Sequence, residues 1–301
     1  MRRIIPWMLL CLFSALVGMG VSFLLNIITP SIISTRVQNT TVASSPISSN
    51  QAESSTLLPL GTNNNNSSIL LINPASVAQD IPIIMYHDVK PVKDVDWDIT
   101  PSHLERHFQT LKNKGITPIT LDQLVDHFRN NTPLPLKPIL LTFDDNYLGE
   151  YLYAFPLLKK YNYPAVWSIH THYVGSQEGK PKADWVQVKE MFQSGLITIA
   201  SHTVNHLRLS KLSSQQVDYE LQESKRVLED QLGTTIKYFT YPEGDYINAL
   251  KPQVIKAGYQ AALTMNLDPQ KEHLANSSDD MLSIMRFGQS EFESIIQKIY
   301  N

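Results

Sequence analysis

The chain has 301 residues, of which 43% are hydrophobic and 18% are charged, and its formal net charge is −3. This length is enough for one large domain or two small ones. The near-neutral charge and the lack of a Lys/Arg-rich run argue against nucleic acid as a partner. The single cysteine, Cys11, lies in the apolar N-terminal segment, so a disulfide or a thiolate site in the folded part is excluded. Any metal must therefore be held by His and carboxylate side chains.

Residues 1–30 have the pattern of a membrane anchor. Arg2 and Arg3 precede an uncharged apolar run from Ile4 to about Ile28, which is long enough to span a bilayer. The run ends in Asn26-Ile27-Ile28-Thr29-Pro30, a poor cleavage site, so we favour an uncleaved anchor over a signal peptide. The two arginines predict a cytoplasmic N-terminus. We therefore expect a single-pass protein of the cell membrane whose folded domain is extracytoplasmic, either periplasmic or extracellular.

Two further regions follow the anchor. Residues 31–79 are rich in Ser, Thr and Asn and carry little charge, which predicts a disordered linker. In residues 80–301, short apolar runs alternate with amphipathic segments. This last region is the predicted folded domain.

The folded region reads as alternating strands and helices. The apolar runs predict strands at 81–86, 139–143, 165–169, 196–200 and 236–241. Thr100 and Thr120 each stand where an N-cap is expected, and helices are also predicted at 185–194, 214–232 and 249–257. This alternation indicates a parallel α/β sheet or barrel.

Two polar motifs stand directly after predicted strands, where α/β folds build their sites. Asp144 and Asp145 end the strand at 139–143. Taken alone, such a pair is more often a polar loop or a helix cap. His202 and His206 follow the strand at 196–200, and their spacing would place both on one face of a helical turn, within reach of one metal ion.

A third motif, Tyr241-Pro242-Glu243-Gly244, forms a predicted tight turn at the end of another strand. Such turns can direct backbone N–H groups at a developing oxyanion, although an ordinary turn is the default interpretation of this piece alone.

Together and in this order, Thr142-Phe143-Asp144-Asp145, Ser201-His202-Thr203-x-x-His206 and Tyr241-Pro242-x-Gly244 resemble the polysaccharide deacetylases of carbohydrate esterase family four, with a NodB-type domain. The segment Ile84-Met85-Tyr86-His87-Asp88-Val89 resembles the branch that acts on exported poly-N-acetylglucosamine. The resemblance implies a distorted (β/α) barrel with fewer than eight strands and a divalent metal site.

Residue roles follow from positions in these motifs. The resemblance implies Asp145, His202 and His206 as the metal ligands. It implies Asp144 as the general base and His87 as the general acid. Zinc suits one Asp and two His ligands best, and cobalt, nickel and iron are also compatible.

The chain departs from the family pattern at two positions. Asn146 stands where the family has Gly, and Asn best tolerates the left-handed backbone there. Glu243 replaces a residue that is often aromatic, and its backbone N–H is the expected oxyanion donor. The resemblance further implies that Arg286 orients the general base.

Other residues carry weaker expectations. His170 and His172 alternate in an extended segment, so they should face one side together. We expect three histidines on amphipathic helices to lie on the surface: His103, His107 and His127. Three aromatic residues are candidates for stacking against a sugar, with core packing favoured for the first of them: Trp167, Trp185 and Tyr173.

The expected function is metal-dependent hydrolysis of N-acetyl groups from an N-acetylglucosamine polymer or peptidoglycan, with release of acetate. One alternative is a catalytically silent module that binds polysaccharide, but the intact Asp and His set argues against it. The other is a metal amidohydrolase for a small amide. The predicted anchor and linker favour a large extracellular substrate.

Overall fold

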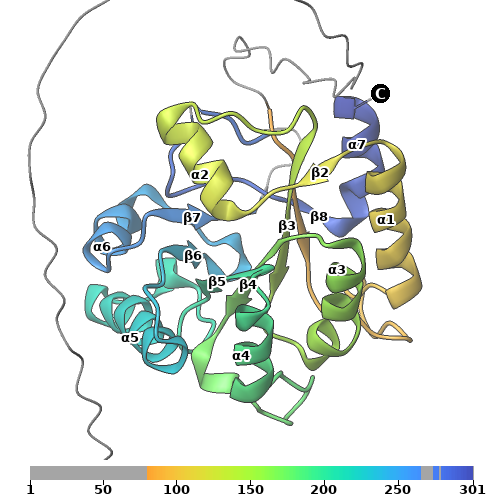
Figure 1. The fold of residues 1–301 in the computed structure, drawn as a ribbon. Coiled ribbons are helices and arrows are strands. Elements are labelled where there is room, and N and C mark those ends of the chain that lie inside the picture. Colours follow the sequence, from red (N-terminus) through yellow and green to blue (C-terminus); the bar gives the residue numbers. More distant parts are fainter. Residues whose placement is uncertain (1–79, 266–273, 278, 301) are drawn as a thin grey trace, which may run out of the picture. The chain divides into compact units, whose positions relative to one another are not determined.

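The computed structural model describes residues 80–265, 274–277 and 279–300 (Figure 1). The predicted anchor at 1–30 and linker at 31–79 lie outside the described residues. Within the described ranges, no helix combines the length and the apolar character needed to cross a bilayer.

Strands and helices alternate along the described chain, as expected. The strands are β1 (Ile83–Tyr86), β2 (Thr117–Pro118), β3 (Pro138–Asp144), β4 (Ala165–Ile169), β5 (Ile197–Ser201), β6 (Tyr238–Thr240), β7 (Ala261–Leu263) and β8 (Phe287–Gly288). The α-helices are α1 (Pro101–Asn113), α2 (Leu121–Asn130), α3 (Phe155–Tyr161), α4 (Trp185–Gln193), α5 (Ser214–Leu232), α6 (Lys251–Lys256) and α7 (Phe292–Tyr300).

The strands form one parallel sheet with the order β7-β6-β5-β4-β3-β1-β8, and β2 pairs with β3 off this path. The segment that leads into β8 also pairs with β7 through a bridge between Ile284 and Leu263. One segment thus contacts both ends of the path, so the sheet curls on itself with helices outside it (Figure 1). This curled half-barrel confirms the predicted α/β class, but the described residues form eight strands, whereas the family resemblance implied fewer than eight.

Local signals explain where the helices begin and end. The Thr100 side chain accepts a hydrogen bond from the backbone of His103, and Thr120 forms a reciprocal capping box with Gln123. Helix α6 is shorter than predicted, because residues 248–250 form a 3-10 turn before it.

Alternate side chains of each strand face the helices or the interior of the half-barrel. Leu140, Val166 and Ala200 belong to the interior apolar cluster. Two residues further along the same faces, the interior side chains are Thr142 and Ser168, both fully buried. The interior therefore changes from apolar to polar toward the carboxyl ends of the strands, where the site lies.

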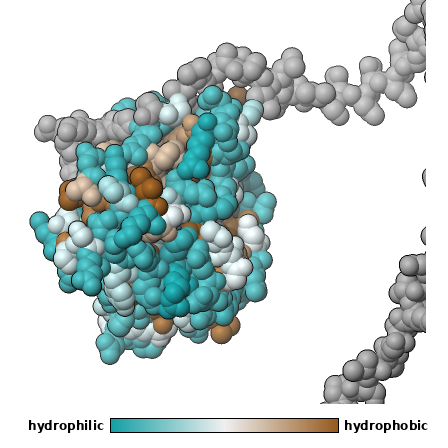
Figure 2. Space-filling model, turned by 90° about the vertical axis from the view of Figure 1, so that its left-hand side faces the viewer, coloured by the Kyte–Doolittle hydropathy of each residue, from teal (hydrophilic) through white to brown (hydrophobic). Residues whose placement is uncertain are grey.

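The face shown in Figure 2 is mostly hydrophilic, with small scattered apolar areas. This is the ordinary surface of a globular domain, whose interior holds most of its large apolar side chains.

Candidate metal centre and active site

A pocket with a volume of about 560 Å³ lies at the carboxyl ends of the strands. It is lined by all seven residues that the sequence motifs single out: His87, Asp144, Asp145, His202, His206, Glu243 and Arg286. The fold thus brings together residues that are widely separated in the sequence.

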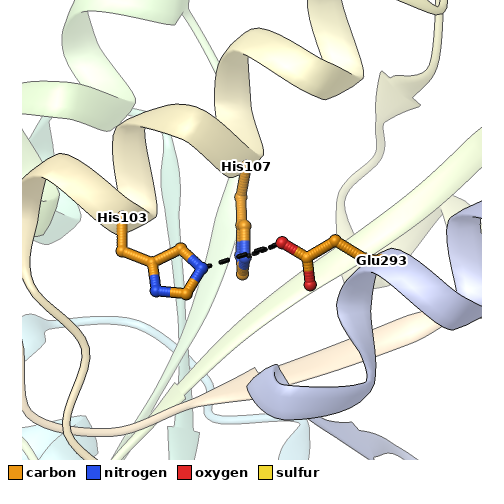
Figure 3. A group of neighbouring side chains, drawn as sticks. All are labelled: His103, His107 and Glu293. Atoms are coloured by element: carbon orange, nitrogen blue, oxygen red, sulfur yellow. Dashed lines mark hydrogen bonds and ion pairs between the residues drawn. The ribbon is translucent and has the colours of Figure 1, made fainter.

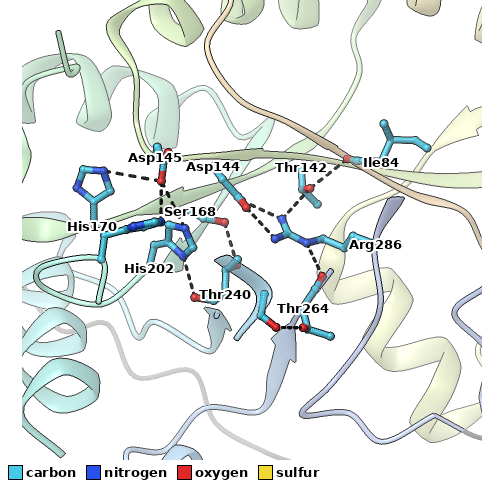
Figure 4. Close-up of polar contacts among 12 residues, drawn as sticks. Ile84, Thr142, Asp144, Asp145, Ser168, His170, His202, Thr240, Thr264 and Arg286 are labelled. Atoms are coloured by element: carbon cyan, nitrogen blue, oxygen red, sulfur yellow. Dashed lines mark hydrogen bonds and ion pairs between the residues drawn. The ribbon is translucent and has the colours of Figure 1, made fainter. Parts of the chain in front are cut away.

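Asp145, His202 and His206 form a compact group of possible metal ligands. One ligand atom from each lies within 4.8 Å of the others. Oδ1 of Asp145 is 3.5 Å from Nε2 of His202 (Figure 4). The same oxygen is 3.2 Å from Nε2 of His206. Ligand atoms around a tetrahedral zinc lie roughly 3.3 Å apart, because each bond is about 2.0–2.1 Å long. Oδ1 of Asp145 is buried without a well-aligned hydrogen bond among the described residues, so the group fits a divalent metal.

The imidazole of His202 is oriented for this role. Its Nδ1 lies 2.8 Å from the carbonyl oxygen of Thr240. A carbonyl can only accept a hydrogen bond, so Nδ1 carries a proton, and Nε2 is the nitrogen that faces Asp145 and is placed to bind a metal.

The two histidines converge by a different route from the one we predicted. Residues 202–206 form a loop after β5, so the expected helical turn is wrong. Thr203 and His206 have φ angles of 68° and 56°, in the left-handed region. The hydroxyl of Thr203 accepts a hydrogen bond of 3.0 Å from the backbone N–H of His206. This local bond stabilises a conformation that is rare for residues other than glycine.

Glu220 of α5 stabilises the same loop through hydrogen bonds. Its buried Oε2 accepts hydrogen bonds of 2.9 Å from the backbone N–H groups of both Val204 and Asn205. Its Oε1 accepts one of 2.7 Å from the side-chain amide of Asn205. The loop that carries His206 is therefore tied to a helix of the scaffold.

Asp144 forms a buried ion pair with Arg286. The guanidinium donates two hydrogen bonds to its carboxylate, of 2.9 and 2.7 Å (Figure 4). Burial raises the pKa of Asp144, but Arg286 and the neighbouring His202 outweigh it and lower this pKa to about 2. Burial also raises the pKa of Asp145, and His202 and His206 hold that pKa well below its ordinary value. Both carboxylates are therefore ionised at neutral pH.

His87 directly follows β1 and faces the pocket, with its ring centroid 5.4 Å from that of Trp97. Burial lowers the pKa of His87, whereas the charges of Asp144 and Asp145 raise it in opposition. A proton on this ring is therefore easily released.

The two departures from the family pattern both adopt left-handed backbone, with φ angles of 55° at Asn146 and 54° at Glu243. The side-chain amide of Asn146 donates a 2.9 Å hydrogen bond to the carbonyl of Ala183. The carboxylate of Glu243 accepts one of 2.6 Å from Nε of Arg208. Arg208 therefore offsets the negative charge that Glu243 brings to the pocket.

Expectations for two pairs of histidines are wrong. His170 is buried with its Nε2 3.9 Å from Oδ1 of Asp145, whereas His172 is exposed, because both follow β4 and lie in a 3-10 turn and its cap. His107 and His127 are buried instead of lying on the surface, because each makes specific contacts within the domain.

The exposed tryptophan of the pocket is a residue that the sequence motifs missed. Trp97 lines the pocket and is 48% exposed, whereas Trp167 lies in the core and Trp185 packs against it. Tyr173 lines a separate, neighbouring pocket. A tryptophan within the polar stretch from Asp94 to Asp98 is a signal that could have identified this residue.

Comparisons with known proteins agree with this geometry. Residues 131–262 match the polysaccharide deacetylase family model. YxkH of Bacillus subtilis, which bears the name of a polysaccharide deacetylase, is 30% identical over 184 residues, 61% of this chain and 64% of that protein. A poly-beta-1,6-N-acetyl-D-glucosamine N-deacetylase of Staphylococcus aureus is 25% identical over 227 residues, 72% of this chain and 76% of that protein.

A solved structure shows the same fold. The Streptococcus pyogenes deacetylase PplD in complex with acetate superimposes with a TM-score of 0.67 and 26% identity, covering 75% of this chain and all of that one. The match to YxkH spans somewhat less than two thirds of that relative. The family model over residues 131–262, these relatives and the shared fold therefore identify a polysaccharide deacetylase domain in this chain.

Proposed function

We propose that this protein is a metal-dependent deacetylase that hydrolyses N-acetyl groups of an N-acetylglucosamine polymer and releases acetate. One observation carries the proposal: Asp145, His202 and His206 converge beside the Asp144–Arg286 pair in a single pocket. A metal site with three protein ligands leaves room for water and substrate, which is the arrangement of catalytic sites.

Asp145, His202 and His206 would hold the metal, most simply zinc, with cobalt, nickel or iron also compatible. When bound, such an ion polarises the acetyl carbonyl and lowers the pKa of a water ligand. Asp144 is ionised and would take the proton of the attacking water, while Arg286 keeps both of its oxygens in place.

Two further groups would act on the tetrahedral intermediate, one as it forms and one as it breaks down. The backbone N–H of Glu243 would stabilise the developing oxyanion. Protonated His87 would donate its proton to the departing amine. The products are free acetate and a glucosamine unit.

Poly-N-acetylglucosamine is the preferred substrate because a relative aligned over 72% of this chain bears that name. A polymer outside the cell also suits the proposed location. Arg2 and Arg3 before the apolar run from Ile4 to Ile28 support a single-pass anchor with the domain extracytoplasmic.

The first test is acetate release from N-acetylglucosamine oligomers by the full chain in detergent, with added zinc or cobalt. We expect metal-dependent release that is abolished in Asp144→Asn and reduced in His87→Ala. Matched controls are Asp230→Asn and His172→Ala, which change exposed residues of the same types. Release that is insensitive to a chelator or to Asp144→Asn would refute the mechanism.

The substrate is tested separately with the same preparation. Poly-N-acetylglucosamine, peptidoglycan and a small N-acetyl amide are compared at equal acetyl content. Preference for peptidoglycan or for the small amide would reassign the substrate. No release from any of them by a folded, metal-loaded protein would indicate a silent binding module.

A further inference from the structure

A second group of His and carboxylate ligands lies outside the pocket. His103 and His107 come from α1, and Glu293 comes from the first turn of α7 (Figure 3). One ligand atom from each lies within 4.8 Å of the others. None of the three lines the pocket of about 560 Å³, so this group is distinct from the site described above.

The distances within this group resemble those of a metal site. Oε1 of Glu293 is 3.1 Å from Nε2 of His107 and 3.7 Å from Nε2 of His103. These values bracket the separation of roughly 3.3 Å between ligand atoms around tetrahedral zinc. At Asp145, the corresponding distances to the two histidines are 3.2 and 3.5 Å.

The helix explains why the two imidazoles lie together. His103 and His107 are four residues apart on α1, so they share one face of the helix. Their ring centroids are 4.7 Å apart. Spacing of this kind on a helix lets two imidazoles bind one ion.

His107 is held in place before any ligand binds. Its side chain is 1% exposed, and its ring stacks on Phe292 at 3.9 Å with an interplanar angle of 7°. Its Nδ1 lies 3.0 Å from the hydroxyl of Tyr86, which leaves Nε2 facing Glu293. A second contact of this kind orients the ligating nitrogen in known metal sites.

We infer that His103, His107 and Glu293 form a second site for a divalent transition metal, with zinc as the preferred ion, that joins α1 to α7. The side chains of His103 and Glu293 are 44% and 66% exposed, so an ion and a water ligand can reach the site from solvent. Two nitrogens and one carboxylate oxygen suit zinc, cobalt, nickel or copper.

The location points to a structural role. Helix α7 follows β8 and the segment that carries Arg286 after one 3-10 turn, Gln289–Glu291. An ion that joins α7 to α1 would therefore fasten the C-terminal segment to the half-barrel. Because the ion binds the folded state, it would raise the melting temperature in a concentration-dependent way.

The test counts zinc bound by the full chain, without a histidine tag, after equilibrium dialysis. The background variant His202→Ala/His206→Ala removes the proposed catalytic ligands, so any zinc retained reports on the second site. We expect about one zinc per chain in this background, and loss of that zinc when His103→Ala or Glu293→Gln is added. His172→Ala, another exposed histidine, is the matched control and should retain the zinc.

Thermal unfolding provides the second readout. Zinc should raise the melting temperature of the background variant and should have no effect once His103→Ala is added. Failure of the background variant to bind zinc, or binding unaffected by His103→Ala and Glu293→Gln, would overturn the second site. Failure of the proposed function would instead appear as absent acetate release by the unmutated protein, whatever the zinc count.

Discussion

Arg286 and Asp144 lie 142 positions apart in the sequence and form a two-pronged ion pair in the interior of the half-barrel. The Arg286 guanidinium also donates hydrogen bonds to the carbonyl of Thr264 and the hydroxyl of Thr142. Both charged groups are buried, so each depends on the other for charge compensation.

Replacing Arg286 tests this dependence. We expect Arg286→Met to destabilise the domain by about 3–5 kcal/mol, because it leaves the Asp144 charge buried and unpaired. The stability of Arg286→Lys should lie between those of the unmutated protein and Arg286→Met, because an ammonium restores the charge without the two-pronged geometry. Urea unfolding measures both. Arg226→Met on the exposed face of α5 is the control and should change stability little, and an equal loss in both Met variants would contradict the prediction.

The support of the 202–206 loop by Glu220 predicts an effect on metal retention. Glu220→Ala removes the acceptor for two backbone N–H groups and one side-chain amide. Loss of an outer contact of this type weakens metal binding by about 10–100-fold. Zinc competition against a chromophoric chelator, in a His103→Ala background, measures the effect. Glu223→Ala, also on α5, is the control, and unchanged zinc affinity in Glu220→Ala would be the contrary result.

Trp97 lines the pocket with an exposed aromatic side chain, so we expect it to bind a sugar ring. The side-chain amide of Gln289 donates hydrogen bonds to the carbonyls of residues 96, 97 and 98, which holds the Trp97 loop in place. Trp97→Ala should raise KM for N-acetylglucosamine oligomers by about tenfold, corresponding to stacking worth about 1.4 kcal/mol, with a smaller effect on kcat. Tyr219→Ala, an exposed aromatic of α5, should leave KM unchanged. A fall in kcat alone would assign Trp97 a different role.

Glu150 predicts a pH dependence of stability. Its side chain is fully buried, and burial raises its pKa well above the ordinary value of 4.5, despite the opposing charge of Lys182. The folded state therefore holds a proton that the unfolded state releases. The contribution of this carboxyl to the free energy of unfolding is fully present below pH 4.5. It is lost as the pH rises toward and through the folded-state pKa.

Replacing the Glu150 carboxyl with a neutral group should prevent this loss of stability at high pH. We expect Glu150→Gln to raise the melting temperature relative to the unmutated protein at about pH 8, and to change it little at about pH 4.5. The exposed Glu178→Gln serves as the control. A difference between the Glu150→Gln variant and the unmutated protein that does not grow with pH would argue against a protonated Glu150.

Much of the fold and the list of site residues could be predicted from local sequence. The apolar runs located β3 and β4 to within a residue at each end, and Thr100 and Thr120 marked the starts of α1 and α2. These features depend on contacts between residues that are close in the chain, such as caps and alternating burial. Asp144 and Asp145 followed from their place at the end of a strand.

Contacts between distant segments were decided by the tertiary structure. Arg286 meets Asp144 because the segment before β8 pairs with β7 while β8 pairs with β1. The spacing of His202 and His206 predicted a helical turn. In the structure they converge through a loop with left-handed backbone, which Glu220 holds in place.

By itself, the sequence determined the alternation of strands and helices and the identity of the polar residues at the strand ends. Only the tertiary structure decided that Trp97 lines the pocket and that His107 is buried against Phe292. The physical reason is that caps and periodicity act over a few residues, whereas these contacts depend on strand order, sheet curvature and helix packing, which the whole chain sets together.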